Sequence, residues 1–321
     1  MVIQENVPMS EHTSFKVGGP ARYFVKAESV SDITQALLFA QEQGLPSFIL
    51  GKGTNLLVSD NGFIGMVIQF GKAFSEITDL GNGKVRVKGA TPLARLARYT
   101  INNGLAGIHK LAGIPGSLGG AIYMNAGAYG QEVSQTCIEV ESIDTAGNIR
   151  TRTAAECAFG YRHSIFQELA KCETKIPELA EGIHSNRLPE IILSATFQLT
   201  PAAVLGKTAK DLENEMQECM KKRRKSQPLS MPNAGSTFKR LAIGAAETPS
   251  QIAPGYYIEQ AGLKGFRIGG AEVSRVHANF IVNAGNASAS DIKELSEHIQ
   301  KVVAEKFGIR LQREIIQLGE F

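Results

Sequence analysis

The stretch Leu111–Gly130, LAGIPGSLGGAIYMNAGAYG, contains six glycines grouped around Pro115. Glycine loses more backbone freedom on folding than other residues, so this cluster indicates that the backbone approaches something closely or takes a positive φ. Pro115 fixes its own φ and biases Ile114 towards an extended conformation, which predicts a shaped segment. Two interpretations stay open from these residues: a tight crossing of two backbones, or free N–H groups facing a phosphate or a flat ring.

A second glycine-containing loop, GKGTN at 51–55, follows a predicted strand at 47–50 and leads into another at 56–58. It matches neither GxxxxGK[ST] nor a GxGxxG that opens a helix, which argues against an ordinary P-loop or Rossmann site. A plain turn stabilised by Asn55 is the structural alternative. Together, the two loops favour a dinucleotide cradle of a different type.

The order of predicted elements divides the 321 residues into three units. The first, 1–76, has a strand–helix–strand order that indicates a small α/β unit. The second, 77–205, is rich in strands, and the third, 206–321, contains two long helices and a terminal strand. The predicted strands lie at 23–27, 47–50, 56–58, 66–69, 84–88, 138–144, 149–153, 191–199 and 314–318, and the predicted helices at 33–40, 92–102, 211–225 and 291–307.

Composition excludes several classes of protein. The chain is 43% hydrophobic and 20% charged, with a net charge of +3, which gives no basis for nucleic-acid binding. The four cysteines form no CxxC pair and show no metal-like spacing with histidines, so we expect reduced thiols and no metal site. No apolar run reaches the roughly 18 residues of a membrane span and no signal-peptide pattern begins the chain, so we expect a cytoplasmic protein without membrane insertion.

Four short motifs carry groups that suit chemistry. Arg162 in FGYRHS presents a fork suited to a carboxylate or an enolate oxygen, although a surface arginine is the alternative. Ser236 follows Ala-Gly in PNAGSTFK, but no GxSxG elbow surrounds it, which disfavours a hydrolase nucleophile. Glu314 belongs to a charged pair on the terminal strand, where an exposed edge is the alternative. The basic run 221–225, KKRRK, is either a solvated helix end or an anion site.

These motifs together resemble one family. GKGTNLLVSD at 51–60, GIPGSLGGAIYMNAGAYG at 113–130, FGYRHSIF at 159–166, PNAGSTFKR at 232–240, the run at 255–283 and REIIQLG at 313–319 occur in family order over almost the whole chain. The family is UDP-N-acetylenolpyruvoylglucosamine reductase. The short passage from the charged helix through QPL to PNAGS resembles its second subtype, which lacks a tyrosine-bearing loop.

The resemblance implies an α+β fold: a two-part FAD-binding module of the p-cresol methylhydroxylase/vanillyl-alcohol oxidase type, followed by a C-terminal α/β substrate-binding domain. It implies FAD as cofactor, NADPH as hydride donor and UDP-N-acetylglucosamine enolpyruvate as acceptor, with UDP-N-acetylmuramate for peptidoglycan synthesis as product. We expect a monomer.

The resemblance also assigns roles to residues. By motif position Arg162, Ser236 and Glu314 form the catalytic trio: Arg162 stabilises an enolate-like charge, Glu314 orients Arg162 or polarises a water, and Ser236 delivers a proton. The residues expected to bind substrate are Arg223, Gln227, Lys239 and Arg240. Those expected to bind FAD are Leu50, Gly51, Lys52, Gly53, Thr54, Asn55, Leu56, Gly113, Ile114, Pro115, Gly116, Ser117, Gly119, Gly120, Ala121, Asn125, Gly127 and Ala128.

Two departures and two rivals accompany the resemblance. Thr54 replaces the usual serine and keeps its hydroxyl, and the segment 168–190 is longer than a hairpin needs, which predicts a surface insertion. An FAD-dependent alcohol or sugar oxidase of the same fold is the enzymatic rival, which oxygen consumption would reveal. A nucleotide-sugar-binding regulator is the non-enzymatic rival, which flavin absorbance would exclude.

Overall fold

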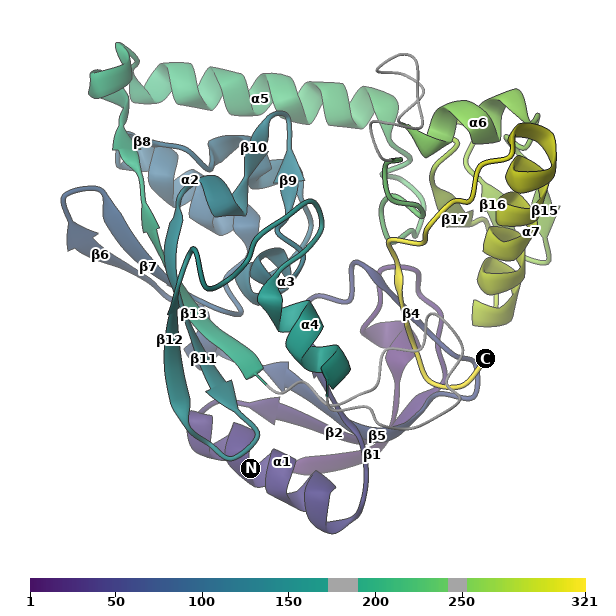
Figure 1. The fold of residues 1–321 in the computed structure, drawn as a ribbon, viewed down its shortest axis with the longest axis horizontal. Coiled ribbons are helices and arrows are strands. Elements are labelled where there is room, and N and C mark those ends of the chain that lie inside the picture. Colours follow the sequence, from purple (N-terminus) through teal and green to yellow (C-terminus); the bar gives the residue numbers. More distant parts are fainter. Residues whose placement is uncertain (173–189, 242–252) are drawn as a thin grey trace.

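The computed structural model describes residues 1–172, 190–241 and 253–321 and shows three groups of strands with helices packed around them (Figure 1). Residues 173–189, which make up most of the predicted insertion, lie outside the described ranges.

The N-terminal unit is a four-stranded sheet with the order β1-β2-β5-β3. Strand β1 is antiparallel to β2, whereas β2 and β3 both run parallel to β5. Helix α1 (Val30–Glu42) begins at Ser29, whose side chain accepts a hydrogen bond from the Asp32 N–H, and its buried face packs on this sheet. The strands are β1 (Ile3–Pro8), β2 (Pro20–Ala27), β3 (Ser47–Leu50) and β5 (Phe63–Phe70), of which β1 was not predicted.

The second unit is a five-stranded antiparallel sheet with the order β12-β11-β13-β7-β6. The predicted hairpin is confirmed as β11 and β12, and β13 lies on the other side of β11. Helix α2 buries Leu96 and Ile101, and both it and α3 belong to the core of this unit. The elements are β6 (Ile77–Gly81), β7 (Lys84–Lys88), α2 (Leu93–Asn102), α3 (Leu118–Tyr123), β11 (Cys137–Asp144), β12 (Ile149–Thr153), α4 (Ile165–Cys172) and β13 (Glu190–Gln198); the two-residue strands β8 (Leu105–Ala106), β9 (Gly127–Ala128), β10 (Gln131–Glu132) and β14 (Thr200–Pro201) form two small ladders.

The glycine-rich stretch holds more helix than its composition predicts. A 3₁₀ turn spans His109–Gly113, and α3 follows within the stretch itself. Each helical glycine costs about 1 kcal/mol relative to alanine. Leu118 and Ile122 are fully buried four residues apart, and this tertiary packing outweighs the low helix propensity.

Helix α5 (Ala209–Ser226) runs from the second unit to the third along the top of Figure 1. The predicted helix at 211–225 is confirmed, and its Leu212 and Met216 are buried against Ile101 and Ala202 of the second unit. The boundary at 206 stays a prediction, since this helix follows it in sequence yet packs on the unit before it.

An ion cluster fixes α5 to the second unit. The Glu215 carboxylate accepts from Lys207 at 2.5 Å and lies 3.2 Å from both Lys110 Nζ and His109 Nε2. The hydrogen bond from Lys207, with those from His109 and Lys110, lowers the pKa of Glu215 to about 2, against a smaller opposing effect of burial.

The third unit shares its core with the N-terminal unit. Its three-stranded antiparallel sheet and two helices bury apolar side chains together with Phe15, Val17 and Leu57. Strand β18 (Ile316–Leu318) then pairs in parallel with β4 (Leu56–Val58), and Asp60 accepts hydrogen bonds from the first N–H groups of α7. The other elements are α6 (Pro254–Gln260), β15 (Arg267–Ile268), β16 (Ala271–Val273), β17 (Ile281–Asn283) and α7 (Ala289–Phe307).

Candidate active site

A cavity of about 1090 Å³ lies where the three units meet. Both glycine-rich loops line it, and so do Arg162, Ser236 and Glu314. Ligand pockets typically measure about 300–1,000 Å³. This one therefore has room for a large cofactor together with a second ligand.

The two glycine-rich loops contact each other at the cavity. The Thr54 hydroxyl donates to the carbonyl oxygen of Pro115 at 2.5 Å, so the residue that departs from the family pattern ties the loops together. Gly53 has φ +61°, and a Cβ there would lie 2.0 Å from the His12 carbonyl oxygen. This backbone conformation and close approach require glycine.

Two other glycines are not required by the packing of the chain. A Cβ on Gly116 would come no closer than 3.7 Å to Thr54 Oγ1, and one on Gly120 no closer than 3.8 Å to Ser117 Oγ, both ordinary contacts. The missing side chains leave space at the cavity wall, where backbone can approach a phosphate or a flat ring. The loops therefore fit a dinucleotide such as FAD.

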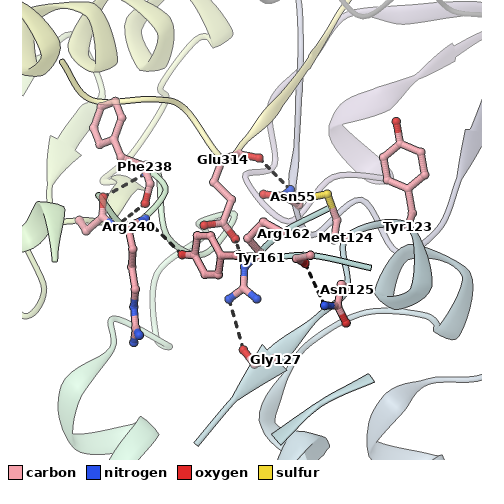
Figure 2. Close-up of polar contacts among 12 residues, drawn as sticks. Asn55, Tyr123, Met124, Asn125, Gly127, Tyr161, Arg162, Phe238, Arg240 and Glu314 are labelled. Carbon is pink, nitrogen blue, oxygen red and sulfur yellow. Dashed lines mark hydrogen bonds and ion pairs between the residues drawn. The ribbon is translucent and has the colours of Figure 1, made fainter. Parts of the chain in front are cut away.

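Arg162 and Glu314 form an ion pair across the cavity (Figure 2). Arg162 Nε donates to Glu314 Oε1 at 2.7 Å, and its Nη2 donates to the Gly127 carbonyl oxygen at 3.2 Å. The pair joins the FGYRHS turn of the second unit to the C-terminal segment. Arg162 has φ +51°, a left-handed conformation that is costly for a residue with a side chain and is found mostly where function requires it.

Ser236 lies on a loop held beside Glu314. The Glu314 N–H donates to the Thr237 carbonyl oxygen at 2.8 Å, so the two candidate residues sit on adjacent segments. Asn279 fixes the loop, because its side chain both accepts from the Phe238 N–H and donates to the Phe238 carbonyl oxygen. In the described part of the chain the Ser236 hydroxyl has no hydrogen-bond partner, which leaves it free for a ligand.

The charge of the cavity wall is positive. Among the residues that the structure describes, six basic side chains line it (Lys16, Lys26, Lys52, Lys72, Arg162 and Arg223), against two acidic ones, Glu190 and Glu314. Both acids are paired with arginines, so the unpaired charge is positive and suits anionic ligands. Arg223 lies near the C-terminal end of α5, and burial lowers its pKa. Gln227, just beyond this helix, has a buried side-chain oxygen without a hydrogen-bond partner in the described residues.

Four predicted site residues do not line the cavity. Asn125 is 1% exposed and its side chain is bound within the chain, and a Cβ on Gly113 would meet the side chain of Arg223. Lys239 bonds through its backbone to Gln312, and the backbone of Arg240 bonds to the Tyr161 hydroxyl. Their assignment as ligands stays a prediction that the geometry of the cavity does not support. The remaining residues predicted for FAD, and Arg223 and Gln227, do line it.

Sequence reasoning missed the side chains at the ends of the parallel strands. Lys26 near the end of β2, Gln69 near the end of β5 and Lys72 just beyond it line the cavity, beside Leu50 at the end of β3, which was predicted. Ligands in open sheets with parallel strands bind beyond the carboxyl ends of those strands. The predicted strands at 23–27, 47–50 and 66–69 thus contained the signal.

Other classes of site find no support in the described ranges. No group of three or more His, Cys, Asp or Glu side chains there is placed to hold a metal ion. None of the helices seen in those ranges has both the length and the apolarity to cross a membrane.

Comparison with known proteins agrees with this arrangement. Residues 21–152 match a family model described as an FAD binding domain, and residues 227–318 match the UDP-N-acetylenolpyruvoylglucosamine reductase C-terminal domain. A UDP-N-acetylenolpyruvoylglucosamine reductase from Syntrophomonas wolfei is 39% identical, with 99% of this chain and 95% of the relative covered. The one from Caldanaerobacter subterraneus is also 39% identical, covering 98% and 93%.

A solved structure shows the same fold. The crystal structure of UDP-N-acetylenolpyruvylglucosamine reductase from Thermus caldophilus matches with a TM-score of 0.75 at 29% identity, covering 99% of this chain and 100% of that one. The fold and the cavity thus define an FAD-binding oxidoreductase in which a third unit completes the site of a two-part cofactor module. Within that class, the chain belongs to the UDP-N-acetylenolpyruvoylglucosamine reductase family.

Proposed function

We propose that this protein is an NADPH-dependent flavoenzyme that reduces UDP-N-acetylglucosamine enolpyruvate to UDP-N-acetylmuramate for peptidoglycan synthesis. The observation that carries the proposal is the meeting of Arg162, Glu314 and Ser236 in the cavity that both glycine-rich loops line. Membership of the family supports it throughout the chain, because the relatives match over nearly full length.

The two glycine-rich loops hold the cofactor. Backbone of residues 51–55 and 114–121 faces the cavity with few obstructing side chains, and Thr54 fixes one loop on the other. When bound, FAD accepts a hydride from NADPH and passes it to the β-carbon of the enolpyruvyl group.

Arg162 stabilises the negative charge that hydride addition creates on the substrate. Its guanidinium is held on one edge by Glu314 and Gly127, while Nη1 has no hydrogen-bond partner within the described residues. A positioned donor of this kind, preorganised in a site away from bulk water, lowers the energy of a developing oxyanion. Glu314 orients the guanidinium.

Ser236 delivers the proton to the α-carbon. Ser236 lines the cavity on a loop hydrogen-bonded to the Glu314 segment, which supports a role at the end of the substrate that Arg162 contacts. Serine is a weak acid, so the transfer depends on the basicity of an enolate and on the nearby positive charge of Arg162.

The UDP part of the substrate suits the wall formed by Arg223 and Gln227. Arg223 offers a charged fork to a diphosphate, and the unpartnered Gln227 oxygen accepts a hydrogen bond from a ligand donor. The short passage from α5 through QPL at 227–229 to PNAGS at 232–236 is consistent with the second subtype. We also propose a cytoplasmic monomer, in keeping with a water-soluble nucleotide-sugar substrate.

The test separates the two half-reactions by stopped-flow absorbance of the purified yellow holoenzyme. In Ser236→Ala, reduction by NADPH stays near the wild-type rate, because that step delivers no proton to the substrate carbon. Reoxidation by the enolpyruvyl substrate slows by about 10²–10⁴-fold, the usual cost of losing a general acid.

Ser236→Cys, which keeps an acidic hydrogen, is the control and loses less than the alanine variant. Absence of flavin absorbance, or rapid reoxidation by oxygen with no response to the enolpyruvyl substrate, would contradict the proposed function. Equal slowing of both half-reactions would contradict the role of Ser236 but not the proposed function.

A further inference from the structure

Two asparagines predicted to bind the cofactor direct their side chains elsewhere. Asn55 ends the GKGTN loop, and Asn125 lies in the glycine-rich stretch Leu111–Gly130. Figure 2 shows the side chain of each reaching a backbone segment that carries one partner of the Arg162–Glu314 pair. Each of these side chains therefore contacts the backbone segment that carries one half of the ion pair.

Asn55 holds the backbone of Glu314. Its Nδ2 donates to the Glu314 carbonyl oxygen at 3.0 Å, and its own carbonyl oxygen accepts from the Ile316 N–H at 3.0 Å. The residue between these two contacts, Ile315, is buried, so the segment is pinned on both sides of one core side chain. These contacts oppose a backbone movement that would turn the Glu314 side chain away from Arg162.

Asn125 holds the turn that carries Arg162. Its Nδ2 donates to the Gly160 carbonyl oxygen at 2.9 Å and to Glu132 at 3.2 Å, while its Oδ1 accepts from the Ser134 N–H at 3.1 Å. Gly160 closes the turn around Arg162 through paired hydrogen bonds with His163. These contacts use both N–H donors of the Asn125 amide, and the side chain is 1% exposed and does not line the cavity, so it is not placed to bind a cofactor there.

The left-handed backbone of Arg162 makes this support necessary. A residue held at φ +51° relaxes unless neighbouring contacts determine its conformation. Gly127, two residues beyond Asn125, accepts from Arg162 Nη2, so the same short segment fixes both the turn and the guanidinium. A displacement of about 1 Å at a reacting group costs about 10²-fold in rate.

We infer that Asn55 and Asn125 are positioning residues for the Arg162–Glu314 pair, through which each cofactor loop sets the geometry of the group that stabilises the substrate charge. The inference rests on the proposed function, since it takes Arg162 and Glu314 as the substrate-side machinery. It assigns these asparagines to the substrate half-reaction and not to cofactor retention.

The test for Asn55 compares Asn55→Ala with Asn283→Ala. Asn283 Nδ2 donates to the Phe15 carbonyl oxygen at 3.1 Å, and its Oδ1 accepts from the N–H groups of Gly285 and Ala287, so the control removes the same kind of contact between the same two units, with two local contacts besides, away from Glu314. We expect Asn55→Ala to keep its flavin and to be reduced by NADPH at the wild-type rate. Its reduced flavin should be reoxidised by the enolpyruvyl substrate about 10–100-fold more slowly. The backbone amide hydrogens of residues 313–318 should exchange faster than in the wild type. Asn283→Ala changes none of these.

The test for Asn125 compares Asn125→Gly with Asn286→Gly. Both asparagines have positive φ, at +41° and +56°, so glycine fits each backbone and only the side chain is removed. We expect the same slowing in Asn125→Gly, with faster exchange in residues 159–164, and no change in Asn286→Gly, whose side chain is exposed.

The outcomes separate this inference from the function on which it rests. A wild-type holoenzyme that lacks either half-reaction overturns the proposed function. If the wild type has both half-reactions and Glu314→Gln slows reoxidation, while Asn55→Ala and Asn125→Gly behave like their controls in rate and exchange, the inference alone fails. Loss of flavin, or equal slowing of both half-reactions, also overturns it, because each indicates a cofactor-binding role.

Discussion

Two arginine–glutamate pairs in this molecule differ in how many of their hydrogen-bonding groups have a partner. Arg152 binds Glu190 through Nε at 2.9 Å and Nη2 at 2.5 Å, and Ser142 donates to the same carboxylate at 2.8 Å, all within one sheet. Arg162 meets Glu314 through a single nitrogen, and the pair joins segments 152 positions apart.

The difference indicates which pair can act on a ligand. Glu190 has both oxygens engaged, whereas Glu314 Oε2 and Arg162 Nη1 have no partner among the residues described. Unused hydrogen-bonding groups beside a cavity are available to a ligand, while a saturated pair in a sheet contributes to the fold. The following substitutions test that division, beginning with the largest effect.

Arg162→Lys keeps the charge and removes the fork. We expect reoxidation of the reduced flavin by the enolpyruvyl substrate to slow by about 10²–10³-fold, because a point charge cannot bind Glu314 and the oxyanion together. Stopped-flow absorbance measures the rate, and the midpoint of thermal unfolding should stay near the wild-type value. Wild-type turnover in this variant would make Arg162 a structural residue.

Arg152→Ala should have the opposite profile. It removes the main charge partner of the buried Glu190 and leaves only the more exposed Arg150 at 3.5 Å, so we expect the free energy of unfolding to fall by about 3 kcal/mol, with the rate per flavin-containing molecule unchanged. Urea unfolding of the holoenzyme and turnover normalised to flavin give the two values. A slower substrate half-reaction without loss of stability would place this pair in the catalytic machinery.

The loss of unfolding free energy in Arg152→Ala should depend on pH, because Glu190 is titratable. Burial alone would raise the pKa of Glu190, but the hydrogen bonds from Arg152 and Ser142 and the charges of Arg152 and Arg150 outweigh it and lower the pKa. A carboxylate with a lowered native pKa stabilises the protein above its unfolded pKa and loses this contribution as pH falls. The difference between wild type and Arg152→Ala should therefore be greatest near neutral pH and shrink in acid.

Gly116→Val tests whether the cavity that the Arg162–Glu314 pair lines is a cofactor-binding site. The backbone φ at Gly116 is not left-handed and an added Cβ makes only an ordinary contact with Thr54, so neither the backbone conformation nor the Cβ itself requires glycine. The branched side chain instead fills the approach to the loop, and we expect flavin content per chain to fall at least about tenfold. Normal flavin absorbance with an unchanged unfolding midpoint would remove this loop from the cradle.

Glu215→Gln probes a third, partly exposed ion cluster and should have the smallest effect. We expect the free energy of unfolding to fall by about 1–2 kcal/mol at neutral pH, because the cluster is only partly shielded from solvent. Since the pKa of Glu215 is lowered to about 2, the difference should disappear as pH falls from the ordinary glutamate range towards that value. Glu218→Gln, an exposed position on the same helix, is the control and should show no such dependence.

The sequence predicted the elements whose patterns are local. The strands at 84–88 and 149–153 have the bounds of β7 and β12, and the capped helices α5 and α7 differ from their predicted ranges by two residues or fewer at either end. Strand β1 was missed because its burial is slight, with four of its six residues exposed, so no apolar alternation marks it. Helix α3 was missed because tertiary packing, not propensity, stabilises it.

The catalytic candidates could be named from motifs, but their geometry could not. Arg162, Ser236 and Glu314 are distant in sequence, and the pairing of Arg162 with Glu314 depends on how the units are placed. Asn125 was assigned to the cofactor because it lies among glycines, and only the structure shows its side chain bonded to Gly160. A glycine-rich context indicates where backbone is accessible and not where a neighbouring side chain points.

The pairing of β4 with β18 makes the site dependent on contacts between residues far apart in the sequence. Asn55 and Glu314 are separated by 259 positions, so their contact closes a very long loop. During synthesis, β4 and the core residues Phe15 and Leu57 await partners that are made much later. Loss of residues 311–318 would remove the carboxylate, the strand partner and part of the shared core at once, so one short segment serves both the site and the fold.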